Sequence, residues 1–174
     1  LDYLEDLGVT VLWISPVLKQ PVFSKNYHGY GIQNFLEIDP HFGDKDDLKE
    51  LVEKAPSRGI YIMLDVIINH SGDVFKYLNE ESAYTGEQYE VEAFRDSKGQ
   101  PSIDPKNPDY DKYYPDGGIW PQKLFDLDTF NRKGYIRNWD NDPEYREGDF
   151  FSLKKINTGQ GNLKNYQASQ ALKT

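Results

Sequence analysis

The sequence predicts an α/β protein whose parallel sheet is followed by a long irregular region. Two near-continuously apolar runs, residues 9–14 and 60–68, are separated by a segment with helical character. Such strands are typical of parallel sheets covered on both faces, as in βα-barrels and doubly wound sheets. From about residue 72 the alternation stops, and a polar stretch punctuated by proline replaces it.

The first expected element is a helix over residues 1–7, because Leu1, Leu4 and Leu7 share one helical face. Gly8 follows, where a C-terminal cap belongs. Because the helical pattern is already under way at the first residue, we expect the N-terminus to be cut. Two parallel strands cannot make a closed sheet, so we expect a fragment of a larger α/β enzyme. A signal peptide cannot be judged from such a start.

A second helix is expected after Gly43. Asp44 is placed as its N-cap, and Asp47 lies in the first turn, where a carboxylate interacts favourably with the helix dipole. A proline inside a helix costs about 3 kcal/mol, so Pro56 predicts that the helix ends by Ala55 or kinks there. The stripe expected to be buried consists of Leu48, Leu51, Val52 and Ala55.

The composition excludes several classes of protein. A net charge of −9 argues against a nucleic-acid partner, and no stretch approaches the roughly 18 apolar residues that would span a membrane. The absence of Cys excludes disulfides and thiolate chemistry but leaves the compartment open. We therefore expect a soluble protein, either cytoplasmic or secreted.

Polar side chains follow both apolar runs. His28 and Tyr30 lie in the loop after the first run, and Asp65, Asn69 and His70 end the second. Loops that follow parallel strands emerge on the same face of a sheet, so these groups can converge. The alternative for His28 and His70 is that each is an ordinary surface or core histidine without a role in a site. A metal-assisted hydrolase using His28, His70 and Asp65 is a further hypothesis, although their spacing lacks a motif such as His-Glu-x-x-His.

Motifs in the first 75 residues carry a resemblance to a known family. They are Val11-Leu12-Trp13-Ile14-Ser15-Pro16-Val17, Tyr27-His28-Gly29-Tyr30, Phe42-Gly43, Arg58-Gly59-Ile60 and Asp65-Val66-Ile67-Ile68-Asn69-His70. In this order they resemble the α-amylase family of glycoside hydrolases, in particular its bacterial α-glucosidase and cyclomaltodextrinase-like members. Trp120-Pro121 and residues 134–139 resemble the same subgroup less specifically.

The resemblance implies an architecture. Residues 1–72 would form part of a TIM (β/α)8 barrel, with 9–14 as its second strand and 60–68 as its third. Residues 73–157 would be an irregular B-domain insertion after the third strand, and 158–174 would return toward the barrel. A complete barrel needs eight strands and about 250 residues, so this chain would hold only part of one.

The resemblance also implies roles for single residues. Tyr30 would stack under the sugar at the cleavage subsite, His70 would hydrogen-bond that sugar, and His28 would line the pocket. Asp65 would support the site and pair with an arginine on a later strand. Asn69 matches a ligand of the structural calcium in calcium-dependent members.

We expect no cofactor, because the calcium site is doubtful. Lys155 stands where the insertion of calcium-dependent members often carries an acid, and its charge would repel the ion.

No catalytic residue is expected in this chain. Retaining glycosidases use a nucleophile and a general acid whose carboxyl groups lie about 5 Å apart. The Gly-x-Arg-x-Asp segment that carries the family's nucleophile is absent from the sequence, so we expect both acids beyond Thr174. The chain alone is predicted to be inactive. The loop acids expected only to be solvated are Asp126, Asp128, Asp140 and Asp142.

The predicted function of the full-length protein is retaining hydrolysis of α-glucosidic bonds. Its expected partner is a carbohydrate, an α-glucan or a maltooligosaccharide. Two alternatives stay open: a glucosyl transferase of the same fold, acting by transglycosylation or on sucrose, and a non-catalytic carbohydrate-binding relative.

Overall fold

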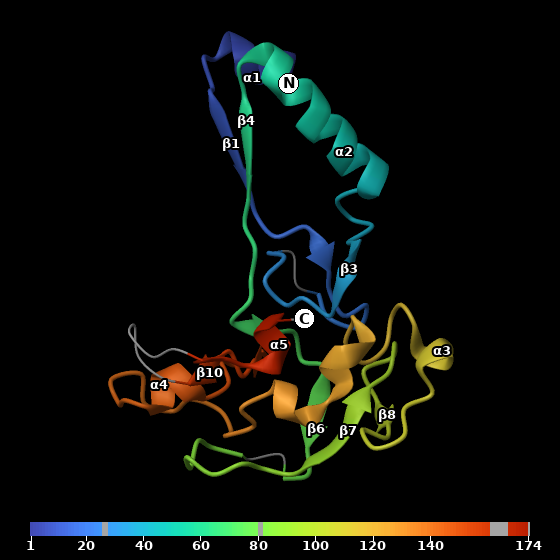
Figure 1. Ribbon diagram of the computed structural model, residues 1–174, viewed down its shortest axis with the longest axis vertical. Coiled ribbons are helices and arrows are strands. Elements are labelled where there is room, and N and C mark those ends of the chain that lie inside the picture. Colours follow the sequence, from blue (N-terminus) through green and yellow to red (C-terminus); the bar gives the residue numbers. More distant parts are fainter. Residues whose placement is uncertain (26–27, 80–81, 161–166, 174) are drawn as a thin grey trace.

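The computed structural model describes residues 1–25, 28–79, 82–160 and 167–173. Its helical segments are α1 (Asp2–Asp6), α2 (Lys45–Lys54), η1 (Ala55–Arg58), α3 (Tyr110–Tyr113), η2 (Gln122–Phe125), η3 (Leu127–Thr129), α4 (Glu144–Glu147) and α5 (Gln170–Lys173). Its strands are β1 (Val11–Ile14), β2 (Leu18–Lys19), β3 (Asn34–Ile38), β4 (Tyr61–Leu64), β5 (His70–Ser71), β6 (Phe75–Tyr77), β7 (Val91–Arg95), β8 (Pro101–Ile103), β9 (Lys154–Lys155), β10 (Gly159–Gln160) and β11 (Gln167–Ala168). Figure 1 shows α1, α2, β1 and β4 at one end of an elongated molecule, and β6, β7 and β8 at the other.

The βαβ unit predicted for the first part of the chain is present. β1 and β4 pair in parallel, with Val11 opposite Tyr61, and α2 runs beside them (Figure 1). β1 starts later than the predicted range 9–14, because the Val9 N–H still bonds the Leu4 carbonyl at the end of α1, at 3.0 Å. Residues 7–10 therefore form a short connection between α1 and β1.

The predicted strand 60–68 is wrong at its C-terminal end. The last backbone hydrogen bond between this strand and β1 runs from the Asp65 N–H to the Ile14 carbonyl, at 2.9 Å. Pro16 on the partner strand has no N–H with which to continue the ladder. Val66 consequently lies outside the sheet and is 62% exposed.

Both predicted helices are confirmed. Gly8, just past α1, has φ +77°, the left-handed conformation that suits a C-terminal cap. Asp44 caps α2: one of its carboxylate oxygens accepts from the Asp47 N–H at 3.0 Å, and the Asp47 carboxylate accepts from the Asp44 N–H at 3.0 Å. This reciprocal arrangement is a capping box. The α-helix ends before Ala55, where η1 takes over and contains Pro56.

The burial predicted for this unit is only partly correct. Ala55 is fully buried, but Val52 is 45% exposed although it was placed in the buried stripe. Trp13 on β1 and Tyr61 on β4 are 68% and 71% exposed, where the apolar runs predicted cover on both faces. The sheet formed by β1 and β4 has two strands in the described part of the chain, so little lies against its faces.

The segment between β1 and α2, predicted as a long loop, contains an antiparallel pair. β2 and β3 run side by side, with Leu18 opposite Ile38. β3 also contacts the later part of the chain, since the Phe35 N–H donates to the Trp120 carbonyl at 2.9 Å. This pair therefore connects the βαβ unit to the residues that follow it.

The region predicted as an irregular insertion has an ordered aromatic core. β6, β7 and β8 form an antiparallel sheet in which Phe75 lies opposite Phe94, and both side chains are fully buried. The Phe75 and Phe130 ring centroids are 5.0 Å apart and nearly perpendicular, the edge-to-face geometry that aromatic pairs prefer. The division at residues 72 and 157 stays a prediction.

A buried ion cluster lies beside this core. Lys154 on β9 is completely buried, and its ammonium lies 3.1 Å from an Asp73 carboxylate oxygen and 3.9 Å from one of Asp149. Tyr77 donates its hydroxyl to Asp149 at 2.7 Å, and Lys154 donates to the Tyr135 hydroxyl at 2.8 Å. Opposite charges and hydrogen bonds thus compensate for the desolvation of this lysine.

None of the helices in the described ranges combines the length and the apolar character needed to traverse a bilayer.

Candidate functional site

The structure brings Tyr30 and Asp65 together from two loops. Tyr30 lies between β2 and β3, and Asp65 directly follows β4. The Tyr30 hydroxyl nevertheless donates to an Asp65 carboxylate oxygen at 3.0 Å. This bond, helped by the negative charge of Asp65, raises the pKa of Tyr30 above its ordinary value. Tyr30 is 36% exposed. Part of this anchored residue is therefore accessible to a ligand.

His70 reaches the same place from β5. Its Nε2 lies 3.1 Å from the Tyr30 carbonyl oxygen, and its Nδ1 lies 3.3 Å from the Asn69 amide nitrogen. Burial lowers the pKa of His70 below its ordinary value, because desolvation disfavours the charged imidazolium. Both ring nitrogens already have partners, so a sugar hydroxyl would share or replace the Tyr30 carbonyl as the partner of Nε2.

His28 completes the group. Its Nδ1 accepts a hydrogen bond from the Tyr30 N–H at 3.1 Å, and the two rings lie 5.7 Å apart between centroids. Gly29 between them has φ +81°, and a Cβ there would lie 2.1 Å from the Pro16 carbonyl oxygen. Only glycine fits this turn, which sets the Tyr30 ring over the pocket. Tyr27, the first residue of this motif, lies outside the described residues.

A cavity of about 320 Å³ opens at these side chains. Its lining consists of His28, Tyr30, His70, Phe150, Phe151, Ser152 and Leu153. Phe150 and Phe151 are not among the site residues predicted from the sequence, so their place in the lining was missed. Phe151 is 71% exposed, and its φ of +52° is uncommon for a residue with a side chain. The signal available was their position shortly before Lys155, which the resemblance placed in the expected insertion.

The metal-site hypothesis finds no geometric support. Across the described ranges, no three His, Cys, Asp or Glu side chains gather as a metal site requires. His28 and His70 instead contact Tyr30, and Asp65 accepts its hydroxyl.

Comparison with known proteins identifies the family. The profile described as "Alpha amylase, catalytic domain" matches residues 1–165. The chain belongs to the alpha-amylase family. It is 37% identical over 152 residues to an alpha-amylase of Streptomyces lividans, covering 82% of this chain and 16% of that protein. It is 32% identical over 146 residues to a cyclomaltodextrinase of Geobacillus thermopakistaniensis, covering 74% of this chain and 24% of that protein.

A solved structure gives the same result. The alpha-amylase of Geobacillus thermoleovorans, crystallised with acarbose, superposes with a TM-score of 0.54 at 25% sequence identity. The match covers 89% of this chain and 25% of that one. The family resemblance predicted from the motifs is thus confirmed, and the chain spans about a quarter or less of the relatives it matches.

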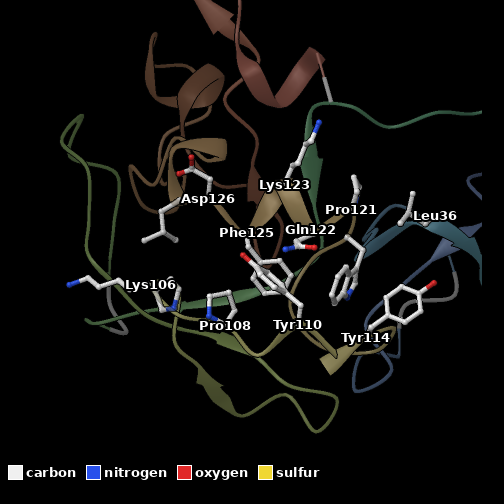
Figure 2. A pocket seen from close by; sticks show the side chains of 13 residues that line it. Leu36, Lys106, Pro108, Tyr110, Tyr114, Pro121, Gln122, Lys123, Phe125 and Asp126 are labelled. Atoms are coloured by element: carbon white, nitrogen blue, oxygen red, sulfur yellow. The ribbon is translucent and has the colours of Figure 1, made fainter. Parts of the chain in front are cut away.

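A larger hollow of this alpha-amylase-family chain lies elsewhere. It has a volume of about 1150 Å³, includes Leu36 of β3 in its lining, and is lined mainly by aromatic and proline side chains. Figure 2 shows Tyr110 beside Phe125, with Tyr114 and Leu36 to one side of them and Lys106 to the other. Size alone would favour this hollow as the active site. The smaller cavity is the better candidate, because it gathers hydrogen-bonded polar groups at the ends of parallel strands.

The loop acids behave as predicted. Asp126, Asp128, Asp140 and Asp142 are all exposed.

Proposed function

We propose that the full-length protein is a retaining glycoside hydrolase that cleaves α-glucosidic bonds of α-glucans or oligosaccharides. In this proposal β1 and β4 are the second and third strands of a (β/α)8 barrel. Residues 73–157 are the insertion that borders the substrate pocket. Membership of the alpha-amylase family and the parallel register of β1 and β4 support this assignment.

The Tyr30–Asp65 hydrogen bond carries the proposal. It fixes an aromatic ring at the C-terminal ends of two parallel strands, where enzymes of this architecture bind their substrates. The ring offers an apolar face to the C–H groups of a glucosyl unit. His70, directly beside it, offers an N–H to a hydroxyl of the same sugar, and His28 borders the pocket.

The proposed roles are binding and orientation. Hydrogen bonds to the sugar that strengthen in the oxocarbenium-like transition state lower the barrier more than they tighten substrate binding. The nucleophile and the general acid are proposed to come from chain beyond Thr174. The 174 residues alone would therefore hold a sugar without cleaving it.

Kinetics of the full-length protein test the site. Tyr30→Ala and His70→Ala are each expected to lower kcat/KM about 10- to 1000-fold on maltooligosaccharides, which corresponds to about 1.4–4 kcal/mol of transition-state stabilisation. Tyr30→Phe keeps the ring and loses the bond to Asp65, so its loss should be smaller. Tyr145→Ala is a matched control, since Tyr145 is 46% exposed and lies outside the pocket.

The outcomes separate the alternatives. Products that keep the anomeric configuration, observed by NMR during turnover, would support retention. Glucosyl products on acceptor sugars in place of free glucose would favour the transferase. Sugar binding without turnover would favour a non-catalytic relative, and wild-type kinetics in both alanine variants would overturn the site.

A further inference from the structure

Two neighbouring lysines on β9 have different surroundings. Successive side chains of a strand point to opposite faces. Lys154 accordingly enters the buried ion cluster with Asp73, whereas Lys155 turns the other way. β9 pairs antiparallel with β5, and this register sets Lys155 opposite His70. The Ile156 N–H also bonds the Asn69 carbonyl, at 3.0 Å, so Lys155 is held against the candidate site by backbone pairing on both sides.

Lys155 determines which way the Asn69 amide faces. Its ammonium donates to Asn69 Oδ1. An ammonium has only donors, so it requires the oxygen of the amide rather than the nitrogen. The Asn69 Nδ2 is thereby directed to His70 Nδ1, 3.3 Å away. The rotational state of the amide follows from its charged neighbour.

The amide in turn restricts His70 to one tautomer. An NH₂ group can only donate, so His70 Nδ1 must carry a lone pair. The Tyr30 carbonyl oxygen, 3.1 Å from Nε2, can only accept, so Nε2 must carry the proton. Both ends of the imidazole thus require the same form, the neutral Nε2–H tautomer. A continuous chain of contacts runs from Lys155 through Asn69 and His70 to Tyr30.

The calcium ion that the family resemblance implies does not fit here. Calcium takes six to eight oxygen ligands, but the Asn69 side-chain oxygen is already bound by an ammonium. In the ranges that the structure describes, His, Cys, Asp and Glu form no cluster of three or more suited to a metal. A second positive charge beside Lys155 would be repelled. The contacts that an ion would make with Asn69 are supplied by the protein itself.

We propose that Lys155 replaces a structural cation and acts as a positioning residue: through Asn69 it holds His70 in the Nε2–H form beside Tyr30. The catalytic consequence rests on the proposed glycosidase function. The tautomer and the absence of a calcium ligand at Asn69 do not, so these parts can be tested without turnover.

The test uses ¹H–¹⁵N NMR of the His70 imidazole in the full-length protein, because the two tautomers give distinct nitrogen shifts. Wild type and Lys155→Arg should show a single Nε2–H form. Lys155→Met, which removes the charge but keeps the chain length, should free the Asn69 amide to rotate and give a mixture. Lys98→Met, on an exposed lysine, is the control and should match wild type. An unchanged Nε2–H signal in Lys155→Met would overturn the positioning role.

A second variant guards against misfolding of Lys155→Met. Asn69→Asp keeps a partner for Lys155 and replaces the amide donor by an acceptor, so His70 Nδ1 should gain a proton. A His70 spectrum identical to wild type in this variant would also overturn the proposal. If the protein is a glycosidase, Lys155→Met should lose about 10- to 100-fold in kcat/KM, and Lys155→Arg should recover most of it.

Calcium provides an independent readout. Added CaCl₂ should shift the Tm of wild type and of Asn69→Ala by the same amount, because Asn69 contributes no ligand. A calcium-induced Tm shift that is present in wild type and lost in Asn69→Ala would contradict the replacement of the cation by Lys155. Failure of the proposed glycosidase function would leave these NMR and Tm results interpretable on their own.

Discussion

The two ends of this molecule bury apolar strands to very different degrees. β1 and β4 are the more apolar by sequence, yet Trp13 and Tyr61 are 68% and 71% exposed. β6 and β7 come from a polar region, yet Phe75 and Phe94 are fully buried. Burial depends on what lies against a strand: the parallel pair has two strands and one flanking helix, whereas the insertion packs its rings against each other. Stability in this chain is therefore expected to reside in the insertion.

Truncations in the two regions should give the largest contrast. Phe94→Ala removes a fully buried ring and should lower the free energy of unfolding by about 3–5 kcal/mol. Trp13→Ala removes a larger but exposed side chain and should change it by no more than about 0.5 kcal/mol. Urea denaturation of the 174-residue chain measures both values. Equal losses would contradict the difference between the regions.

The buried ion cluster should give the next largest effect. Lys154→Met leaves the buried Asp149 without its cation, whereas Asp73 keeps Arg95 at 3.1 Å. The free energy of unfolding should fall by about 3 kcal/mol, since removing one partner leaves a buried charge uncompensated. Removing both charges, in Lys154→Met with Asp149→Asn, should cost less than the single change. A single variant as stable as wild type would show that the cluster adds nothing to the insertion.

The smallest effect on stability is expected at the contact between the insertion and β3. Tyr114 of the insertion donates its hydroxyl to Glu37 of β3 at 2.6 Å, and this bond holds the pKa of Glu37 below its ordinary value. A carboxyl with a lowered folded-state pKa stabilises the fold above the unfolded pKa of about 4.3 and loses this effect as the pH falls through the folded value.

Tyr114→Phe should accordingly lower Tm slightly at pH 7 and leave it unchanged near pH 2, where Glu37 is protonated in both states. Tyr145→Phe, on a tyrosine of similar exposure, serves as the control at both pH values. A Tyr114→Phe effect that persists at low pH would assign the stabilisation to packing rather than to the carboxylate.

Local signals predicted the βαβ unit well. The cap at Asp44, the break at Pro56 and the glycine at Gly8 act within a few residues of each element, so they are visible in the sequence. Tyr30 and His70 were singled out in the sequence because they lie in the segments that follow the two apolar runs, and the family resemblance implied their roles. The parallel register of β1 and β4 brings the segments that follow these strands to one edge of the sheet.

Features that depend on distant partners were not predicted. Phe75 lies opposite Phe94 on the paired strands β6 and β7, which are too short to show a clear alternation of apolar and polar residues. From the sequence alone Lys154 would be expected on the surface, and only the fold brings Asp73 and Asp149 close to it. The β2–β3 pair was missed for the same reason: β3 is held partly by a hydrogen bond to the carbonyl of Trp120, which is distant in the sequence.

Native-state hydrogen exchange of the 174-residue chain tests the central contrast most directly. Amides that exchange through global unfolding mark the stable core, and those that exchange by local opening lie outside it. The account predicts that the amides of β7 exchange slower by orders of magnitude than those of β4. Equal protection in β4 and β7 would contradict it and would show that the two regions unfold as one unit.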